Sequence, residues 1–351
     1  MKVCLVLTHQ CNLGCSYCYA GEKFRSQMSY ETGLRSLNLA FQKPGPLEIS
    51  FFGGEPMIAF ESLARLTRVA HRWAQRQRRP LRFAITTNAT ILKEKHLHFL
   101  RHYNFFVGIS LDGVEEVHDR HRPFVGGRGS GELVWRNLEQ ASQVLDDFRV
   151  LMVVRPDTVA GLPQAIERMY RLGVSKVSLL PEVESDWSKS HEELREVYTR
   201  LARICFLSML TDEPMWISPF VELHPAQRRP DSPLEPAHQV PVQRGCGFGS
   251  DEVAISPRGN FYPCARLVGP DVRNEVRIGT LDAGFDLEKI ERLQHMASDQ
   301  LSHCGSGGCQ CLALMPGDTR AQLENVALFT RITGEACRAA ELELAGEVVA
   351  A

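Results

Sequence analysis

The sequence contains no long apolar run. No stretch approaches the roughly 18 consecutive apolar residues that a membrane-spanning helix needs. The apolar run Val3–Leu7 is too short for the core of a signal peptide, and polar residues rather than small ones follow it. We therefore expect a cytoplasmic protein that makes no membrane contact.

An excess of charge of either sign is also lacking. Forty Lys and Arg residues stand against forty-two Asp and Glu residues, so the formal net charge is -2. A surface dedicated to nucleic acid or to anionic lipid normally shows a strong basic excess. Neither partner is expected. Hydrophobic residues make up 44% of the 351 residues, enough to bury the core of one large domain and a smaller one.

Cysteine, by contrast, is plentiful. Eleven cysteines in a cytoplasmic protein call for an explanation other than disulfides, because that compartment keeps thiols reduced. Cys4 lies in an apolar strand pattern and Cys205 on the apolar side of a helix pattern, so both are assigned to the core. The other nine form two groups, which indicates metal ligation. They are Cys11, Cys15 and Cys18, and then Cys246, Cys264, Cys304, Cys309, Cys311 and Cys337.

The first two-thirds of the chain alternate strand and helix patterns. Six βα units in series predict a parallel sheet, since each crossover returns the chain in the same direction. We expect an α/β fold with a partial (β/α)6 barrel, open on one side, whose ligands gather at the C-terminal ends of the strands. The predicted strands are Lys2–Thr8, Leu47–Phe52, Leu81–Thr87, Phe106–Leu111, Arg149–Val154 and Lys176–Leu180, and the predicted helices are Tyr30–Gln42, Glu61–Gln77, Lys93–His102, Leu133–Asp146, Leu162–Leu172 and His191–Leu210.

Composition divides the chain into three parts. The βα pattern occupies residues 1–213. Residues 214–241 hold seven prolines and few apolar runs, which predicts a connector without regular structure. Residues 242–351 form a smaller domain rich in Gly and Cys, with a final helix from about Asp318 to Leu344.

Three cysteines follow the first predicted strand. Cys11, Cys15 and Cys18 form a CxxxCxxC run. Three thiolates on one tight loop can bind three irons of a [4Fe–4S] cube and leave the fourth iron without a protein ligand. On spacing alone, a zinc site completed by His9 is the alternative.

Four segments together carry a family resemblance. CNLGCSYCY (11–19), FFGGEP (51–56), ITTNATIL (85–92) and VGISLDGVEEVHDRHR (107–122) occur in order, each at or just after the end of a predicted strand. In these segments the sequence resembles the radical S-adenosylmethionine (SAM) superfamily, over roughly residues 1–210. The resemblance implies a [4Fe–4S] cluster on the first segment and SAM bound at its open iron.

The resemblance also implies which residues contact SAM. Gly53 and Gly54 allow the main chain to approach a ligand closely. Carbonyl groups of this turn, together with the Glu55 carboxylate, can accept hydrogen bonds from the SAM ammonium group. Ser110 and Arg122 can donate to its carboxylate, a planar anion that suits arginine.

Two further positions complete this expected set. Tyr17 can place its ring or main chain against the adenine. Asn88 lies in the third segment, where a turn or cap residue is the alternative, and Glu55 could instead cap the next helix. The expected SAM-binding residues are Tyr17, Gly53, Gly54, Glu55, Asn88, Ser110 and Arg122.

The chemistry follows from the same resemblance. The reduced cluster donates one electron to the sulfonium of SAM, and the resulting 5′-deoxyadenosyl radical abstracts a hydrogen atom from the substrate. The protein positions the reactants and keeps stray hydrogen donors away. The electron is expected from an external donor of the flavodoxin or ferredoxin type.

The second cysteine group begins with a Cys-x12-Gly-x4-Cys segment. Gly259 fits a hairpin turn between strand-like Glu252–Ser256 and Asn260–Tyr262. This segment resembles the opening of the SPASM domain, which like the shorter twitch domain carries auxiliary iron–sulfur clusters in radical SAM enzymes.

The tail departs from the full SPASM pattern. That pattern has seven cysteines with a Cys-x2-Cys-x5-Cys-x3-Cys core, whereas this chain has six, with Cys304-x4-Cys309-x1-Cys311. One auxiliary [4Fe–4S] cluster is expected, and two only if one has an open iron or a non-cysteine ligand. A structural zinc knuckle is the alternative, because spacing alone does not identify the metal.

The combined motifs resemble enzymes that act on peptides or proteins. One such group installs crosslinks or epimerises residues in ribosomally made peptides, and the other, the anaerobic sulfatase-maturating enzymes, oxidises a Cys or Ser to formylglycine. The second group carries an aspartate directly after the Gly-x4-Cys cysteine, whereas Cys264 is followed by Ala265 and Arg266. A peptide maturase is therefore favoured, and no catalytic base is identified.

The expected partner is a precursor peptide. Because the cysteine loop begins at residue 11, an N-terminal recognition domain is not expected. Either a separate peptide-recognition protein delivers the precursor, or the peptide docks on the barrel opening as an added strand. A radical SAM dehydrogenase or epimerase of a small sugar or aminoglycoside is an alternative, as is an iron–sulfur electron carrier, which would not need the second and fourth segments.

Overall fold

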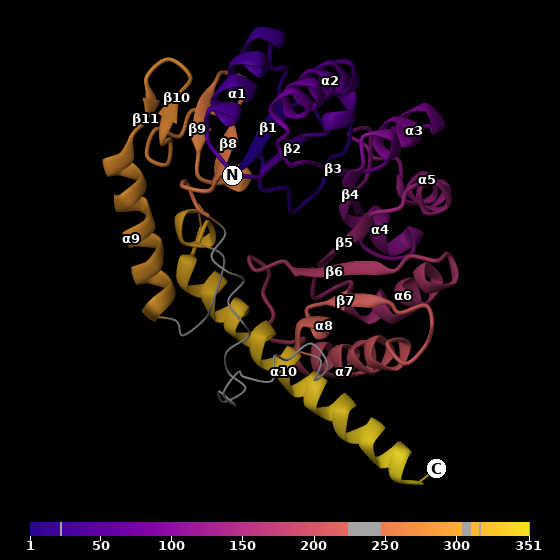
Figure 1. Ribbon diagram of the computed structural model, residues 1–351. Helices are drawn as coiled ribbons and strands as arrows, with labels where there is room; N and C mark the ends of the chain where they lie inside the picture. Colours follow the sequence, from indigo (N-terminus) through magenta and orange to yellow (C-terminus); the bar gives the residue numbers. More distant parts are fainter. Residues whose placement is uncertain (22, 224–246, 304–309, 316, 351) are drawn as a thin grey trace.

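The computed structural model describes residues 1–21, 23–223, 247–303, 310–315 and 317–350. Within these ranges the strands form one curved sheet in the order β11-β10-β9-β8-β1-β2-β3-β4-β5-β6-β7 (Figure 1). The strands are β1 Lys2–Thr8, β2 Leu47–Gly53, β3 Leu81–Thr87, β4 Phe105–Ser110, β5 Phe148–Val154, β6 Lys176–Pro181, β7 Trp216–Ser218, β8 Glu252–Ile255, β9 Asn260–Tyr262, β10 Gly279–Thr280 and β11 Gly284–Phe285.

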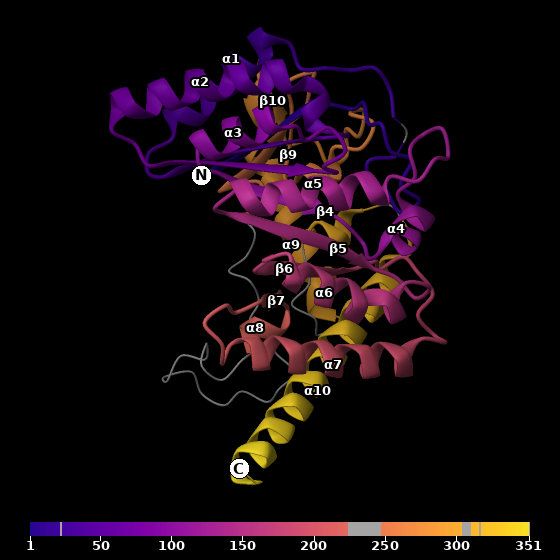
Figure 2. The ribbon, with the colours of Figure 1, turned by 90° about the vertical axis from the view of Figure 1, so that its right-hand side faces the viewer.

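Helices connect most of these strands (Figures 1 and 2). The α-helices are α1 Tyr30–Gln42, α2 Phe60–Gln77, α3 Glu94–His102, α4 Glu115–His121, α5 Gly131–Val144, α6 Leu162–Arg171, α7 His191–Ser208, α8 Phe220–Leu223, α9 Leu287–His303 and α10 Thr319–Ala350. Short 3-10 helices are η1 Pro56–Ala59, η2 Val159–Gly161, η4 Ala265–Leu267 and η5 Leu312–Leu314.

The strands from β1 to β7 pair in parallel with their neighbours in sequence order. Their C-terminal ends therefore lie along one edge of the sheet, as the βα pattern predicted. β1 lies inside the sheet between β8 and β2, and its residues from Val3 to Thr8 are all buried. Such a buried, mostly apolar strand is expected where both faces of a sheet are covered. The prediction of an α/β fold with an open, parallel, partial barrel is confirmed.

Part of the predicted connector is regular. β7 and α8 lie inside residues 214–241, and Ile217 pairs with Val177 of β6. β7 has only three residues and lies between Pro214 and Pro219, so it shows no recognisable strand pattern in the sequence. The prediction of a connector without regular structure is therefore wrong up to Leu223. The remainder of that stretch lies outside the described residues.

The tail adds strands to the same sheet. β8 pairs in parallel with β1, from Lys2 opposite Glu252 to Leu5 opposite Ile255. The predicted hairpin follows, with Gly259 at a φ of 80° in the turn. Residues 250 positions apart in the sequence thus pair in one sheet, which no local pattern could indicate.

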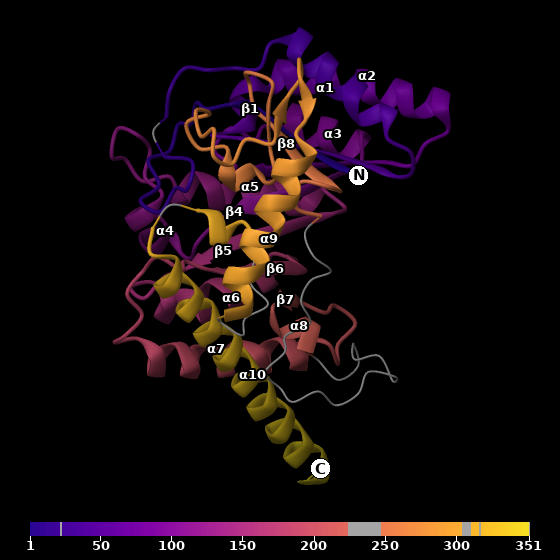
Figure 3. The ribbon, with the colours of Figure 1, turned by 90° about the vertical axis from the view of Figure 1, so that its left-hand side faces the viewer.

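The C-terminal helix α10 packs along α7 (Figures 1 and 3). Phe329 of α10 lies edge-on to Trp187, with ring centroids 4.7 Å apart, and also contacts Tyr198 of α7. An ion pair of 3.1 Å between Arg195 and Glu335 spans the same interface. Among the described residues, no helix has the length and apolarity needed to cross a membrane.

Candidate functional site

The three N-terminal cysteines lie on the loop that leaves β1. Cys11, Cys15 and Cys18 are each partly exposed, and none is in a disulfide. Two main-chain hydrogen bonds fix the loop to the segment after α4: Gly14 N donates to Pro123 O (2.8 Å), and Val125 N donates to the carbonyl of residue 12 (3.0 Å). The loop is therefore held in place by the protein's own main chain.

Gly53 and Gly54 lie directly against the chain that leads into this loop. Gly54 N donates to Thr8 O at 2.8 Å. A Cβ atom on Gly54 would lie 2.3 Å from Gln10 O, and one on Gly53, whose φ is 151°, would lie 2.3 Å from Thr8 O. Only glycine permits this approach, so the pair serves the fold as well as any ligand.

The Glu55 carboxylate is engaged inside the protein. It is 1% exposed and accepts hydrogen bonds from Met57 N (3.0 Å), Thr87 Oγ1 (2.7 Å) and Asn88 N (2.7 Å). Burial raises the pKa of Glu55 to about 7, because its effect exceeds that of these three hydrogen bonds, which lower the pKa. Glu55 thus caps η1 and ties β2 to β3, the alternative role that the sequence left open.

Asn88 connects the end of β3 to the cysteine loop. Its Nδ2 donates to Asn12 Oδ1 (2.9 Å) and lies 3.7 Å from Cys11 Sγ. Its Oδ1 accepts from Thr90 Oγ1 (2.7 Å), and Asn12 Nδ2 donates back to Thr90 Oγ1 (2.8 Å). Asn88 is therefore more than a turn residue, because it orients the loop that carries the first cysteine.

A buried ion pair lies on the other side of the loop. Arg122 Nε donates to Asp112 Oδ2 at 2.7 Å, and both side chains are less than a tenth exposed. Burial alone would raise the pKa of Asp112, but the adjacent Arg122 guanidinium holds it below its usual value. Tyr17 OH donates to the same carboxylate, and the Arg122 guanidinium lies 5.2 Å from the Tyr17 ring centroid.

Two side chains at this edge have donor groups that make no hydrogen bond within the described residues. The Ser110 hydroxyl, at the end of β4, makes no hydrogen bond with the part of the chain that the structure describes, nor do the two Nη groups of Arg122. Both side chains are mostly buried. These are the two side chains that the sequence assigned to an anionic carboxylate.

Sequence reasoning missed Arg155, which follows β5. Its guanidinium lies 5.7 Å from the Tyr17 ring centroid, and its Nη1 donates to Glu182 Oε2 at 3.1 Å. The Tyr17 ring therefore contacts two arginines, Arg122 and Arg155. The rule that residues after successive parallel strands converge would have found Arg155, had it been applied to the fifth strand.

Sequence reasoning also missed a chain of polar groups beside the loop. Ser16 Oγ lies 2.8 Å from His121 Nδ1, and His121 Nε2 lies 2.7 Å from Asp157 Oδ2. Ser16 N in addition donates to His121 O at 3.0 Å. These contacts orient the stretch between the second and third cysteines.

The donor set fits an iron–sulfur cube. Burial raises the pKa of Cys11, and that of Cys15 to about 11, so both thiols are protonated at neutral pH until a metal displaces the protons. In the described ranges, no three Cys, His, Asp or Glu side chains converge as ligands of a single ion. A cube does not require such convergence, because each cysteine binds a different iron.

Three of the six tail cysteines lie within the described residues. Cys311 and Cys337 are buried and Cys264 is partly exposed, whereas Cys246, Cys304 and Cys309 lie outside the described residues. Cys337 lies on the stretch of α10 that packs on α7. A buried core cysteine would look the same, so ligation by the six tail cysteines stays a prediction.

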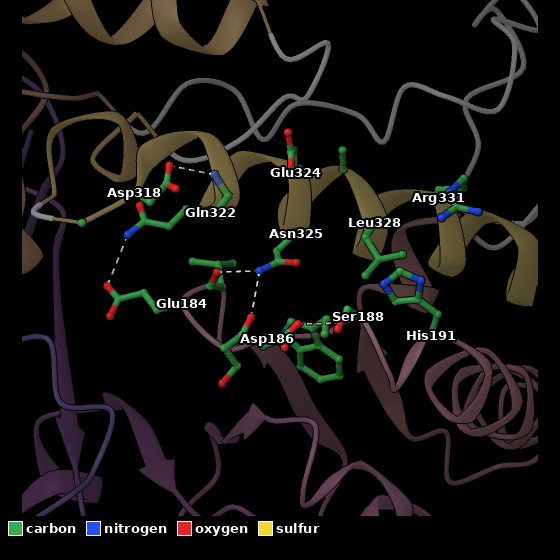
Figure 4. Close-up of a pocket in the computed structure, with 16 residues that line it drawn as sticks. Glu184, Asp186, Ser188, His191, Asp318, Gln322, Glu324, Asn325, Leu328 and Arg331 are labelled. Atoms are coloured by element: carbon green, nitrogen blue, oxygen red, sulfur yellow. Dashed lines mark hydrogen bonds between the residues drawn. The ribbon is translucent and has the colours of Figure 1, made fainter.

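A cavity of about 830 Å³ lies between α10 and the loop that follows β6 (Figure 4). Asn325 fixes the loop by donating to Val183 O (2.8 Å) and Ser185 O (3.0 Å). The loop begins with Glu182, the partner of Arg155, so the cavity lies beside the strand ends described above. Burial and the nearby Glu182 raise the pKa of Glu184, one of the lining residues.

The chain is similar to several known proteins. A model of the radical SAM superfamily matches residues 5–169. The chain is 25% identical over 289 residues to the cysteine-type anaerobic sulfatase-maturating enzyme of Clostridium novyi, covering 78% of this chain and 74% of that one. It is 24% identical over 313 residues to the subtilosin biosynthesis protein AlbA of Bacillus subtilis, covering 86% and 63%.

In some relatives the similar region covers only part of the protein. The chain is 27% identical over 174 residues to an uncharacterized protein of Methanocaldococcus jannaschii, covering 50% of this chain and 60% of that protein. The chain thus spans less than two thirds of the length of this protein and of AlbA.

Solved structures show the same fold. Native anSMEcpe with bound AdoMet and Kp18Cys peptide matches with a TM-score of 0.65 at 18% identity, covering 83% of this chain and 80% of that one. Streptococcus suis SuiB bound to precursor peptide SuiA matches with a TM-score of 0.55 at 15% identity, covering 77% and 60%.

Proposed function

We propose that this chain, whose residues 5–169 match a model of the radical SAM superfamily, is a peptide maturase that modifies a residue of a ribosomally made peptide. The observation that carries this proposal is the cysteine loop, which Asn88 and the chain after α4 hold at the C-terminal ends of the parallel strands. When bound there, a [4Fe–4S] cluster and SAM would supply a 5′-deoxyadenosyl radical that takes a hydrogen atom from the substrate.

The residues of this edge have distinct roles in the proposal. Ser110 and Arg122 would bind the SAM carboxylate, since their donors are uncommitted within the described chain. Carbonyl groups of Gly53 and Gly54 would accept from the ammonium group. Because the Tyr17 ring is engaged by two arginines and its hydroxyl by an aspartate, the main chain of Tyr17 is the part that would meet the adenine.

A peptide substrate is supported by the relatives and by the space beside the strand ends. AlbA is named for bacteriocin biosynthesis, and anSMEcpe and SuiB have been solved with peptides bound. The cavity next to the β6–α7 loop has a volume within the roughly 300–1,000 Å³ of ligand pockets. An external donor of the flavodoxin or ferredoxin type would supply the electron, and tail cysteines would hold one or two auxiliary clusters.

Sulfatase maturation is the second candidate, favoured by the similarity to the Clostridium novyi enzyme over 78% of this chain. Against it, the residue directly after Cys264 is Ala265, which has no carboxylate. Arg266 comes next, and its guanidinium lies 5.7 Å from the Tyr19 ring centroid. The oxidation to formylglycine would need a base from elsewhere.

Mass spectrometry distinguishes the candidates. The protein, reconstituted anaerobically with iron and sulfide, is incubated with SAM, dithionite and either a short peptide encoded beside its gene or a Cys-type sulfatase peptide. A mass change in the first peptide alone supports the proposal, and formylglycine in the second supports sulfatase maturation. SAM cleavage with neither peptide changed, but with a sugar oxidised, would overturn both.

A further inference from the structure

Lys23 contacts the cysteine loop, although it belongs to none of the four sequence segments that carry the family resemblance. Its Nζ donates to Cys18 Sγ at 2.7 Å, and the side chain is half-buried. None of the described residues offers Lys23 a carboxylate as an ion-pair partner. A positive charge without a described counter-charge therefore touches the third cysteine.

The other contacts of this loop differ from that one. The sulfur of Cys11 receives neutral donors, Leu13 N at 3.5 Å and Asn88 Nδ2 at 3.7 Å. The two arginines around Tyr17 are each paired with a carboxylate, Arg122 with Asp112 and Arg155 with Glu182. Their charges are largely balanced, whereas that of Lys23 is not balanced by any residue described.

The segment after Lys23 is anchored to the end of β1. Phe24 stacks on His9 with ring centroids 4.3 Å apart. Ser26 O accepts from His9 N (3.0 Å) and from Thr8 Oγ1 (2.8 Å). Because these contacts follow directly, the main chain next to Lys23 cannot move far from the loop.

We propose that Lys23 is a positioning residue that raises the reduction potential of the cluster bound by Cys11, Cys15 and Cys18, by placing its ammonium group against the Cys18 sulfur. Reduction adds one electron, supplied by an external reductant, to a group that already carries thiolate charge. A nearby cation stabilises the more negative, reduced state, and net charge and hydrogen bonds to the sulfurs are among the main determinants of such potentials. The iron-bound sulfur keeps lone pairs that can accept this hydrogen bond.

The inference rests on the cluster that the family implies and not on the peptide substrate. A redox titration of the reconstituted full-length protein, followed by EPR without SAM or peptide, therefore tests it separately. A chain that titrates as proposed but modifies no peptide would refute the proposed function alone.

Three variants make the test specific. Lys23→Met removes the charge and keeps the length, Lys23→Arg keeps the charge, and Arg25→Met removes an exposed charge from the same segment. Lys23→Met is expected to lower the ratio of reduced to oxidised cluster about tenfold at a fixed potential, a shift of about 59 mV for one electron. Lys23→Arg should retain most of the wild-type potential, and Arg25→Met all of it.

A Lys23→Met protein with full iron content and the wild-type potential would overturn the proposal. Should this variant fail to hold the cluster, Lys23→Gln is titrated instead, and the wild-type potential in that variant has the same consequence. If every neutral variant lacks the cluster while Lys23→Arg holds it, the charge serves assembly and the proposal as stated is wrong.

Discussion

The edge of the sheet that carries the first cysteine loop and the tail that carries the later cysteines differ in how their sulfurs are held. At the edge, the Asn88 side chain after β3 and the main chain of the segment 121–125 contact the loop, and Gly54 after β2 contacts the chain that leads into it. In the tail, Cys311 and Cys337 are buried among apolar residues of η5 and α10. The comparison indicates that the first site is preorganised by polar contacts, whereas the described part of the tail is organised by apolar packing.

The largest effect is expected from breaking the first site. Cys15→Ala removes one of the three proposed iron ligands, so the cluster should be lost and 5′-deoxyadenosine formation should fall to background. Chromatography of the products after anaerobic reconstitution measures this. Undiminished SAM cleavage in this variant would show that the loop does not bind the cluster.

The next largest effect is expected at Cys337 in the tail. Cys337→Ala should lower the iron content per chain, because Cys337 is predicted to bind an auxiliary cluster, and wild-type iron should exceed the four atoms of a single cube. Cys205→Ala is the matched control, since Cys205 is also a buried helix cysteine, and it should leave iron unchanged. Equal iron in both variants would make Cys337 a core residue, and one equivalent of zinc would favour a zinc knuckle.

A smaller effect is expected from the close approach at the first site. Gly54→Ala would place a methyl group 2.3 Å from Gln10 O, so the main chain must shift. We expect the free energy of unfolding to fall by about 2 kcal/mol, together with weaker cluster retention.

Gly126→Ala is the control for this substitution, because a Cβ at Gly126 meets nothing within 4 Å. Urea unfolding of the two variants should separate them clearly. If both unfold at the wild-type urea concentration, the contact between the Gly53–Gly54 turn and the loop is not needed for stability.

The last expected effect concerns pH. The pKa of Glu55 is raised from 4.5 to about 7 in the folded protein, chiefly by burial. The folded state therefore binds more protons than the unfolded state between these values, and stability should fall as pH rises from about 4.5 to about 7 and then level off. The loss attributable to Glu55 is on the order of 3 kcal/mol, at about 1.4 kcal/mol for each unit by which the pKa is raised.

Urea unfolding of the cluster-free protein at several pH values tests this slope. Glu55→Gln should reduce it, and Glu61→Gln, a change to an exposed carboxyl on α2, should leave it intact. A slope that is the same in all three proteins would show that Glu55 is ionised in the fold.

Most of the βα framework could be predicted from the sequence. β1, β3 and α1 begin and end at the predicted residues, and β4 is displaced by one residue. These elements bury long, regular apolar patterns, so local periodicity suffices to find them. By contrast, β7 has three residues and is stabilised by pairing with β6, and α4 has seven residues, of which only His118 is buried.

The candidate site divides in the same way. The three cysteines and the Gly-Gly-Glu turn are local patterns, and the sequence identified them. The roles of Glu55 and Asn88 and the contact of Lys23 with Cys18 depend on side chains meeting in space. Nothing local distinguishes Lys23 from other lysines of the chain, and Arg155 lies 138 residues beyond Tyr17, whose ring it contacts.

The sequence by itself determined the parallel βα framework, the loop of three thiols and the resemblance to the radical SAM superfamily, because each depends on residues that are close together in the chain. Only the tertiary structure decided that β8 pairs with β1, that Glu55 links β2 to β3, and which cation lies against a cysteine of the loop. These contacts join distant segments, and their geometry follows from the packing of the whole sheet and its helices rather than from any local preference.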